Sequence, residues 1–183
     1  MNTFSCLSTI GNLEERAYLY PSASLPVITE LILLLSHGEK PVRARAAVDL
    51  AAMGSPAVDP LIATLRDTRW EVRYRAVEAL GQIRDPRVCR ALTGVLEDPR
   101  DHVRYMAAKG LGQQRCTGAV EELCRALADE NEYVRRISAW SLGTIGDPGA
   151  LPALRERMGN ETSSSVRDAI AQACRQLEEI PRN

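Results

Sequence analysis

The chain has 183 residues and a formal net charge of −1, with 45% hydrophobic but only 4% aromatic side chains. A net charge so close to zero provides no overall attraction to nucleic acid or to an anionic membrane. The length suffices for one domain with a substantial core, and many small and aliphatic side chains favour packed helices over a β-sandwich.

The N-terminal segment, residues 1–23, lacks the basic start and long apolar run of a secretory signal. Its spaced apolar residues, among them Phe4, Ile10 and Leu19, predict a cap that folds over the first helix pair. The following apolar run, residues 25–36, is too short to span a bilayer and is interrupted by Glu30. We therefore expect a cytoplasmic protein without a membrane partner.

From residue 24 onward the sequence repeats itself. A Val-Arg pair recurs at intervals of 30, 31, 31 and 32 residues, at Val42-Arg43, Val72-Arg73, Val103-Arg104, Val134-Arg135 and Val166-Arg167. Such regular self-similarity is typical of solenoid proteins. It predicts five repeats, at about residues 24–56, 57–86, 87–117, 118–148 and 149–183.

Each repeat contains two amphipathic helical patterns. In the second repeat, the first pattern consists of Val58, Leu61, Ile62 and Leu65, and the second of Val72, Ala76, Ala79, Leu80 and Ile83. One helix pair of this size cannot bury its apolar faces alone, so the repeats must stack on one another. The sequence therefore predicts an all-α fold, a right-handed α-solenoid of about five two-helix repeats.

The junctions between repeats carry helix-breaking residues. Ser55-Pro56, Asp85-Pro86 and Asp147-Pro148 end the second helix and turn the chain into the next repeat. The third repeat has Cys116-Thr117-Gly118 at this place. We expect this junction to turn less rigidly than the others.

An acidic residue stands six residues before the repeated arginine in four of the five repeats. The pairs are Asp67 and Arg73, Asp98 and Arg104, Asp129 and Arg135, and Glu161 and Arg167, whereas the first repeat has His37 before Arg43. The row of repeated arginines could form an anion-binding track. The acidic residue at a constant spacing before the arginine instead favours a structural ladder of charge-assisted hydrogen bonds within or between repeats.

The segments "EVRYRAVEALGQIRDP" and "YVRRISAWSLGTIGDP" resemble the HEAT repeat family, and in particular its short phycobilin lyase (PBS lyase) HEAT-like repeats. The resemblance covers about residues 24–180. It implies several functions: a protein-binding scaffold, a subunit that attaches or detaches bilins, or a module appended to an enzyme. Lyase-like relatives often work as heterodimers, so a related repeat protein is one expected partner. The fold alone does not decide among these functions.

In solenoids of this kind the second helices line the concave face, and the positions that point away from the core vary. In repeats two to four these positions and their neighbours are Trp70, Tyr74, Arg75, Glu78, Tyr105, Met106, Lys109, Arg136, Ile137 and Trp140. Tyr, Trp, Met and Arg are enriched at the centres of protein interfaces. We predict that this face binds another protein or a peptide segment. The alternative is that these side chains only cover the neighbouring repeat.

Enzymatic and nucleic-acid-binding functions have less support. The sequence has no GxSxG, Walker or HExxH motif, and neither histidine precedes a glutamate as in HEAT-like iron hydroxylases. We therefore expect no catalytic residue, metal or cofactor. A bilin lyase subunit remains the alternative, because aromatic and arginine side chains could hold a tetrapyrrole with its propionates. Nucleic-acid binding is a third hypothesis, opposed by Glu78, Asp168 and the low net charge.

The five cysteines are odd in number and show no CxxC spacing. Zinc binding would require clustered ligands, which the sequence does not provide. We interpret them as reduced, small apolar residues of a cytosolic protein.

Overall fold

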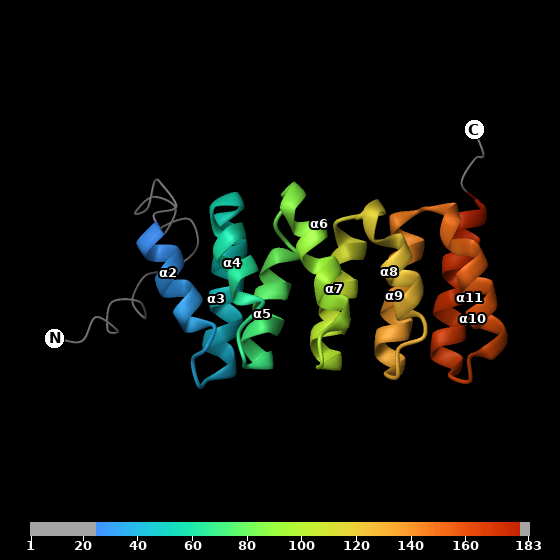
Figure 1. Ribbon diagram of the computed structural model, residues 1–183, viewed down its shortest axis with the longest axis horizontal. Helices are drawn as coiled ribbons and strands as arrows, with labels where there is room; N and C mark the ends of the chain where they lie inside the picture. Colours follow the sequence, from blue (N-terminus) through green and yellow to red (C-terminus); the bar gives the residue numbers. More distant parts are fainter. Residues whose placement is uncertain (1–24, 180–183) are drawn as a thin grey trace.

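The computed structural model describes residues 25–179, which form ten α-helices and four short 3₁₀-helices with no β-strand in this range. The α-helices lie side by side in chain order, so the two ends of the described chain are at opposite ends of an elongated array (Figure 1). The predicted cap, residues 1–23, lies outside the described residues. No helix of residues 25–179 is long and apolar enough to cross a membrane.

The helices form five successive pairs. They are α2 (Leu25–Leu34) with α3 (Lys40–Met53), α4 (Val58–Thr64) with α5 (Trp70–Leu80), α6 (Pro86–Thr93) with α7 (Asp101–Gln113), α8 (Val120–Ala126) with α9 (Glu132–Ile145), and α10 (Leu151–Asn160) with α11 (Ser164–Glu178). The 3₁₀-helices are η2 (Ser55–Ala57), η3 (Gly94–Glu97), η4 (Thr117–Ala119) and η5 (Pro148–Ala150). The predicted right-handed α-solenoid is confirmed.

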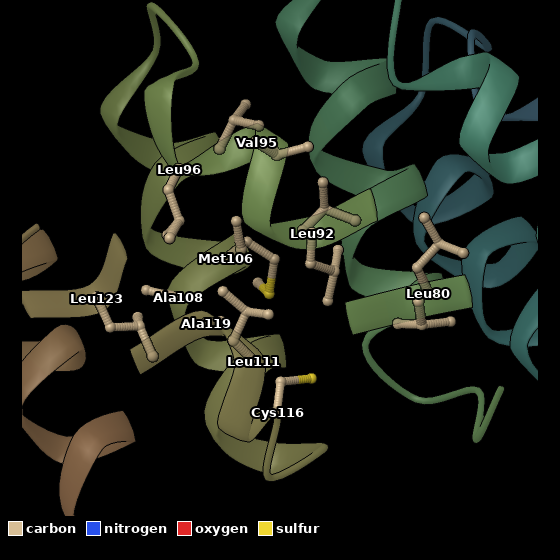
Figure 2. Close-up of a cluster of buried hydrophobic side chains, with 14 of the residues drawn as sticks. Leu80, Leu92, Val95, Leu96, Met106, Ala108, Leu111, Cys116, Ala119 and Leu123 are labelled. Atoms are coloured by element: carbon tan, nitrogen blue, oxygen red, sulfur yellow. The ribbon is translucent and has the colours of Figure 1, made fainter. Parts of the chain in front are cut away.

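The core is continuous along the array. Leu80 of α5, Leu92 of α6, Leu111 of α7 and Leu123 of α8 are fully buried, and Figure 2 shows them in one cluster that crosses repeat boundaries. Burying each such side chain contributes about 1.5–3 kcal/mol. Each repeat is therefore stabilised mainly by its neighbours.

Small residues bring the second helices into close contact. A Cβ atom added to Gly81 would lie 3.2 Å from the Cα of Gly110, and one added to Gly112 would lie 2.9 Å from the Cα of Ser141. The Ser141 hydroxyl donates a hydrogen bond of 2.7 Å to the carbonyl of Ala108 across the same contact. These contacts hold α5, α7 and α9 in one closely packed row.

The Asp-Pro junctions begin the next repeat as well as ending the previous one. Asp85 caps α6 because its side chain accepts a hydrogen bond of 3.0 Å from the backbone N–H of Arg87, and Pro86 takes the first helical position. Asp147 accepts in the same way from Gly149 at 2.8 Å. A backbone N–H group that has no acceptor inside the helix thus finds one in the aspartate side chain of the same turn.

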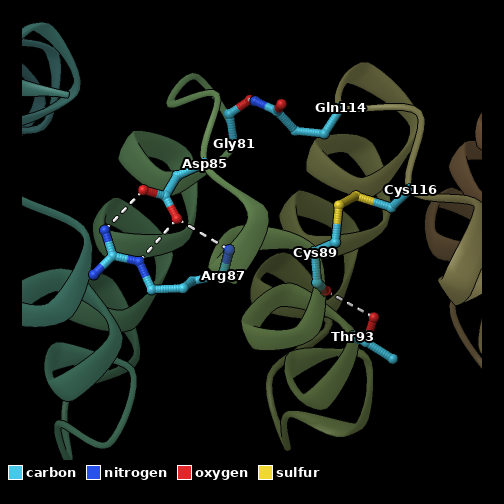
Figure 3. Close-up of a disulfide and its surroundings, with 7 residues drawn as sticks. All are labelled: Gly81, Asp85, Arg87, Cys89, Thr93, Gln114 and Cys116. Atoms are coloured by element: carbon cyan, nitrogen blue, oxygen red, sulfur yellow. Dashed lines mark hydrogen bonds and ion pairs between the residues drawn. A yellow bond between two sulfur atoms is a disulfide. The ribbon is translucent and has the colours of Figure 1, made fainter. Parts of the chain in front are cut away.

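The third junction is fixed by a disulfide bond, which corrects the expectation of reduced cysteines for Cys89 and Cys116, whereas Cys124 and Cys174 are free thiols. Cys89 of α6 and Cys116, which follows α7, are bonded with their Cα atoms 5.6 Å apart (Figure 3). Arg115 has a left-handed backbone (φ 52°), and the N–H of Cys116 donates to the carbonyl of Leu111. This turn brings Cys116 over α6, a proximity that is hidden by the 27 residues separating the two cysteines.

Candidate functional site

The repeated arginines join each repeat to the next. Arg73 donates to both carboxylate oxygens of Asp98 at 2.6 and 2.8 Å, and Arg104 donates to those of Asp129 at 2.7 and 2.8 Å. Arg135 donates likewise to Glu161 at 2.8 and 3.0 Å. Each pair is therefore a two-pronged contact between neighbouring repeats, which is the strong geometry for arginine and carboxylate.

Each of these arginines also binds the turn of its own repeat. Arg104 donates to the backbone carbonyl of Asp98 at 2.9 Å, and Arg135 donates to that of Asp129 at 2.9 Å. The Arg135 guanidinium holds the pKa of the buried Glu161 carboxyl well below its usual range. Because the donors of Arg73, Arg104 and Arg135 are engaged inside the protein, these three arginines support the stack and do not form an anion-binding track.

The ladder is incomplete at both ends. Arg43 donates to the carbonyls of His37 and Gly38, and its Nε atom is buried without a hydrogen-bond partner. Asp67, the acid of the second repeat, pairs with Arg69. Arg167 lies in α11, the last helix that the structure describes.

Two adjacent hollows lie on the row of second helices. The first is lined by Tyr74, Asp101, His102, Tyr105, Asn131, Tyr133 and Arg136. The second is lined by Tyr105, Lys109, Arg136, Ile137, Trp140 and Ala169. Because Tyr105 and Arg136 border both, the hollows form one surface across α5, α7, α9 and α11, which we call the aromatic groove.

The groove brings together six of the ten residues predicted for the binding face. They are Tyr74, Tyr105, Lys109, Arg136, Ile137 and Trp140. Trp140 is 37% exposed, and its indole is therefore partly available to a ligand. Burial raises the pKa of the Tyr74 hydroxyl, which stays protonated and can donate a hydrogen bond at neutral pH.

The other four predicted residues do not line the groove. Met106 is packed in the core, because it lies one helical turn after the buried Val103 on the same face of α7. Arg75 is also buried, and it pairs with Glu78 within α5. The Trp70 ring packs 5.5 Å from that of His102 and under the Arg100 guanidinium, so Trp70 covers the neighbouring repeat.

The sequence-based prediction missed side chains at the starts of α7 and α9. His102 and Tyr133 each immediately precede the repeated Val-Arg pair, so the alignment itself could have found them. Asp101 links the two helix starts by accepting hydrogen bonds from His102 and Asn131, and the His102 contact lowers its pKa. Tyr133 is 55% exposed, with Arg136 stacked over its ring at 5.4 Å.

The chemistry of the groove follows from the side chains that line it. Its side chains supply flat apolar surface, two cations and several hydrogen-bond donors. Within residues 25–179, no group of three or more His, Cys, Asp or Glu side chains has the arrangement of a metal site.

Comparison with known proteins identifies the repeats. A model of HEAT repeats matches residues 28–108 and again residues 95–175. No curated protein matches the chain significantly in sequence.

Several solved structures share the fold. One is the complex of CpcE and CpcF of phycocyanin lyase from Nostoc sp. PCC7120, with a TM-score of 0.74 and 23% identity over 82% of this chain and 99% of that one. Human deoxyhypusine hydroxylase matches with a TM-score of 0.60 and 26% identity, over 86% of this chain and 64% of that one. A designed armadillo repeat protein in complex with the peptide (KR)4 matches with a TM-score of 0.58 and 20% identity, over 92% of this chain and 87% of that one.

Proposed function

Because this chain belongs to the HEAT repeat family, we propose that it is a non-catalytic interaction module that binds a segment of a partner protein in the aromatic groove of repeats two to four. The observation that carries the proposal is the groove itself. Tyrosine, tryptophan and arginine side chains from three consecutive second helices, α5, α7 and α9, line one connected surface. These residue types dominate the energetics of protein interfaces.

The structural neighbours support a protein or peptide as the partner. The designed armadillo repeat protein is in complex with a peptide, and CpcE is in complex with CpcF. A helix or an extended segment would fit a groove of this kind. The proposal includes, as one such partner, a second repeat protein that presents this segment.

The double variant Tyr105→Ala/Trp140→Ala tests the groove directly. It removes the two largest rings of the second hollow, so binding of the partner isolated with the wild-type chain should fall by about 100-fold. The measurement is partner titration by calorimetry, with the melting temperature checked for each protein. The control, Arg90→Ala/Glu156→Ala, changes exposed residues of the first helices and should bind like wild type. Equal binding by the groove variant and the control contradicts the proposal.

A bilin lyase subunit is the second candidate function. The observation in its favour is the likeness to the phycocyanin lyase complex over nearly the whole of that chain. In this case Lys109 and Arg136 would pair with the propionates of a tetrapyrrole that lies against Trp140. Titration of a free bilin with the chain distinguishes the two functions, since a shift of the bilin absorption band that Trp140→Ala abolishes favours the lyase function.

A further inference from the structure

The second hollow of the aromatic groove is lined by two cations that form no ion pair within the described part of the chain. Lys109 of α7 and Arg136 of α9 line the hollow together with Trp140, and neither forms an ion pair with any residue of the described part of the chain. Other arginines of the same helices behave differently, since Arg104 of α7 pairs with Asp129 and Arg135 of α9 pairs with Glu161. The two cations of the hollow are thus available to an external anion.

Acidic residues bound this positive surface on both sides. Glu78 occupies on α5 the repeat position that Lys109 occupies on α7, and Asp168 occupies on α11 the position of Arg136 on α9. Neighbouring helix axes are about 8–10 Å apart. The attractive region therefore extends over about one helix spacing, enough for one or two carboxylates. A long polyanion would meet Asp168 on α11, whereas the Glu78 carboxylate on α5 is already paired with Arg75.

We propose that the partner segment carries a short acidic element next to an apolar or aromatic side chain. This inference rests on the proposed function and specifies its partner. The carboxylate pairs with Lys109 and Arg136, while the neighbouring apolar side chain packs on Trp140 and Ile137. Partial burial strengthens such an ion pair, because the surrounding rings exclude water. Nucleic acid fits the same site poorly, because its phosphates continue beyond the two cations.

The experiment selects random short peptides displayed on phage against the full-length chain. Selected peptides should carry Asp or Glu within a few residues of a large apolar side chain. Synthetic copies should bind Lys109→Glu/Arg136→Glu about tenfold or more weakly than wild type. The control Lys40→Glu/Arg84→Glu has the same net charge but changes exposed residues outside the groove, and it should bind like wild type. Peptides with Lys in place of the acid should prefer the Lys109→Glu/Arg136→Glu variant.

The outcomes separate this inference from the function on which it rests. Peptides that need Trp140 but contain no acid, or that bind Lys109→Glu/Arg136→Glu unchanged, overturn the acidic partner and leave the groove as the binding site. Selection of no peptide that depends on Trp140 overturns both proposals. Binding of a single-stranded oligonucleotide that Lys109→Glu/Arg136→Glu abolishes would replace the acidic segment by nucleic acid.

Discussion

At the scale of single residues, the fate of each arginine depends on whether a carboxylate lies within reach. Arg104 stands two residues before Met106 in the third repeat and reaches Asp129 of the fourth, so its charge is neutralised inside the protein. Arg136 follows Arg135 directly, and the helix step of about 100° between them turns Arg136 toward the groove. One position in the repeat therefore supports the stack, and the next is open to a ligand.

The ladder leads to a prediction about two matched arginines. Arg104→Met leaves Asp129 without its partner in a site where both side chains are at most 10% exposed, so the free energy of unfolding should fall by about 3–5 kcal/mol. Arg43→Met removes hydrogen bonds only to two backbone carbonyls, and the loss should be about 1–2 kcal/mol. Urea denaturation measures both. Equal losses would mean that the ion pair between repeats adds nothing to the free energy of unfolding.

At the scale of helices, contact between second helices depends on residues without a side chain. Gly112 of α7 faces Ser141 of α9 so closely that a methyl group would collide with the backbone of α9. Gly143 of α9 meets Ala173 of α11 in the same way. Gly110 is less constrained, because its nearest neighbour is the flexible end of Leu92.

Gly112→Ala should lower the stability of the protein even though alanine is the better helix former. The overpacking penalty of about 1–3 kcal/mol exceeds the helix-propensity gain of about 1 kcal/mol. Gly159→Ala is the control, because this glycine lies in α10 with open space around it and should gain stability from the same substitution. Thermal melting of the two variants checks this, and a stabilised Gly112→Ala would show that α7 and α9 can move apart at little cost.

The sequence predicted the helices better than it predicted the groove, for a physical reason. Core positions follow one helical period, so Leu61 and Val72 could be assigned as buried from the pattern alone. The groove depends on which side chains the neighbouring repeats cover once they are stacked. Met106 is covered and buried, whereas Tyr133 lines the groove. The disulfide was missed because its partner lies in an irregular turn that no periodic pattern describes.

At the scale of the whole molecule, the third repeat connects two halves of the chain. Repeats two and four each join it through one ladder contact, Arg73 with Asp98 and Arg104 with Asp129. In a solenoid, stability is approximately a sum of repeats and nearest-neighbour interfaces. The Cys89–Cys116 bond therefore strengthens the repeat on which both halves depend.

Reduction of the disulfide should lower the melting temperature of the whole chain. Opening a loop between cysteines 27 residues apart releases a constraint of roughly 3–4 kcal/mol on the unfolded chain. Melting with and without a reductant measures the effect, and the Cys89→Ala/Cys116→Ala variant should be insensitive to the reductant. A titration of the unreduced, denatured chain should find two fewer thiols than after reduction. A melting temperature unaffected by the reductant would contradict the structural role of this bond.

The ladder contacts also bear on how such a chain changes in length. The third and fourth repeats each contribute one arginine to the repeat that follows and one acid to the repeat that precedes, as Arg104 and Asp98 do in the third. A tandem duplication of a gene segment encoding one repeat therefore inserts a unit whose two contacts are already matched. Growth by whole units preserves the stack, whereas a duplication that separates the acid from its arginine leaves one of them without a partner. Evolution can thus lengthen the row of second helices without changing the contacts between the existing repeats.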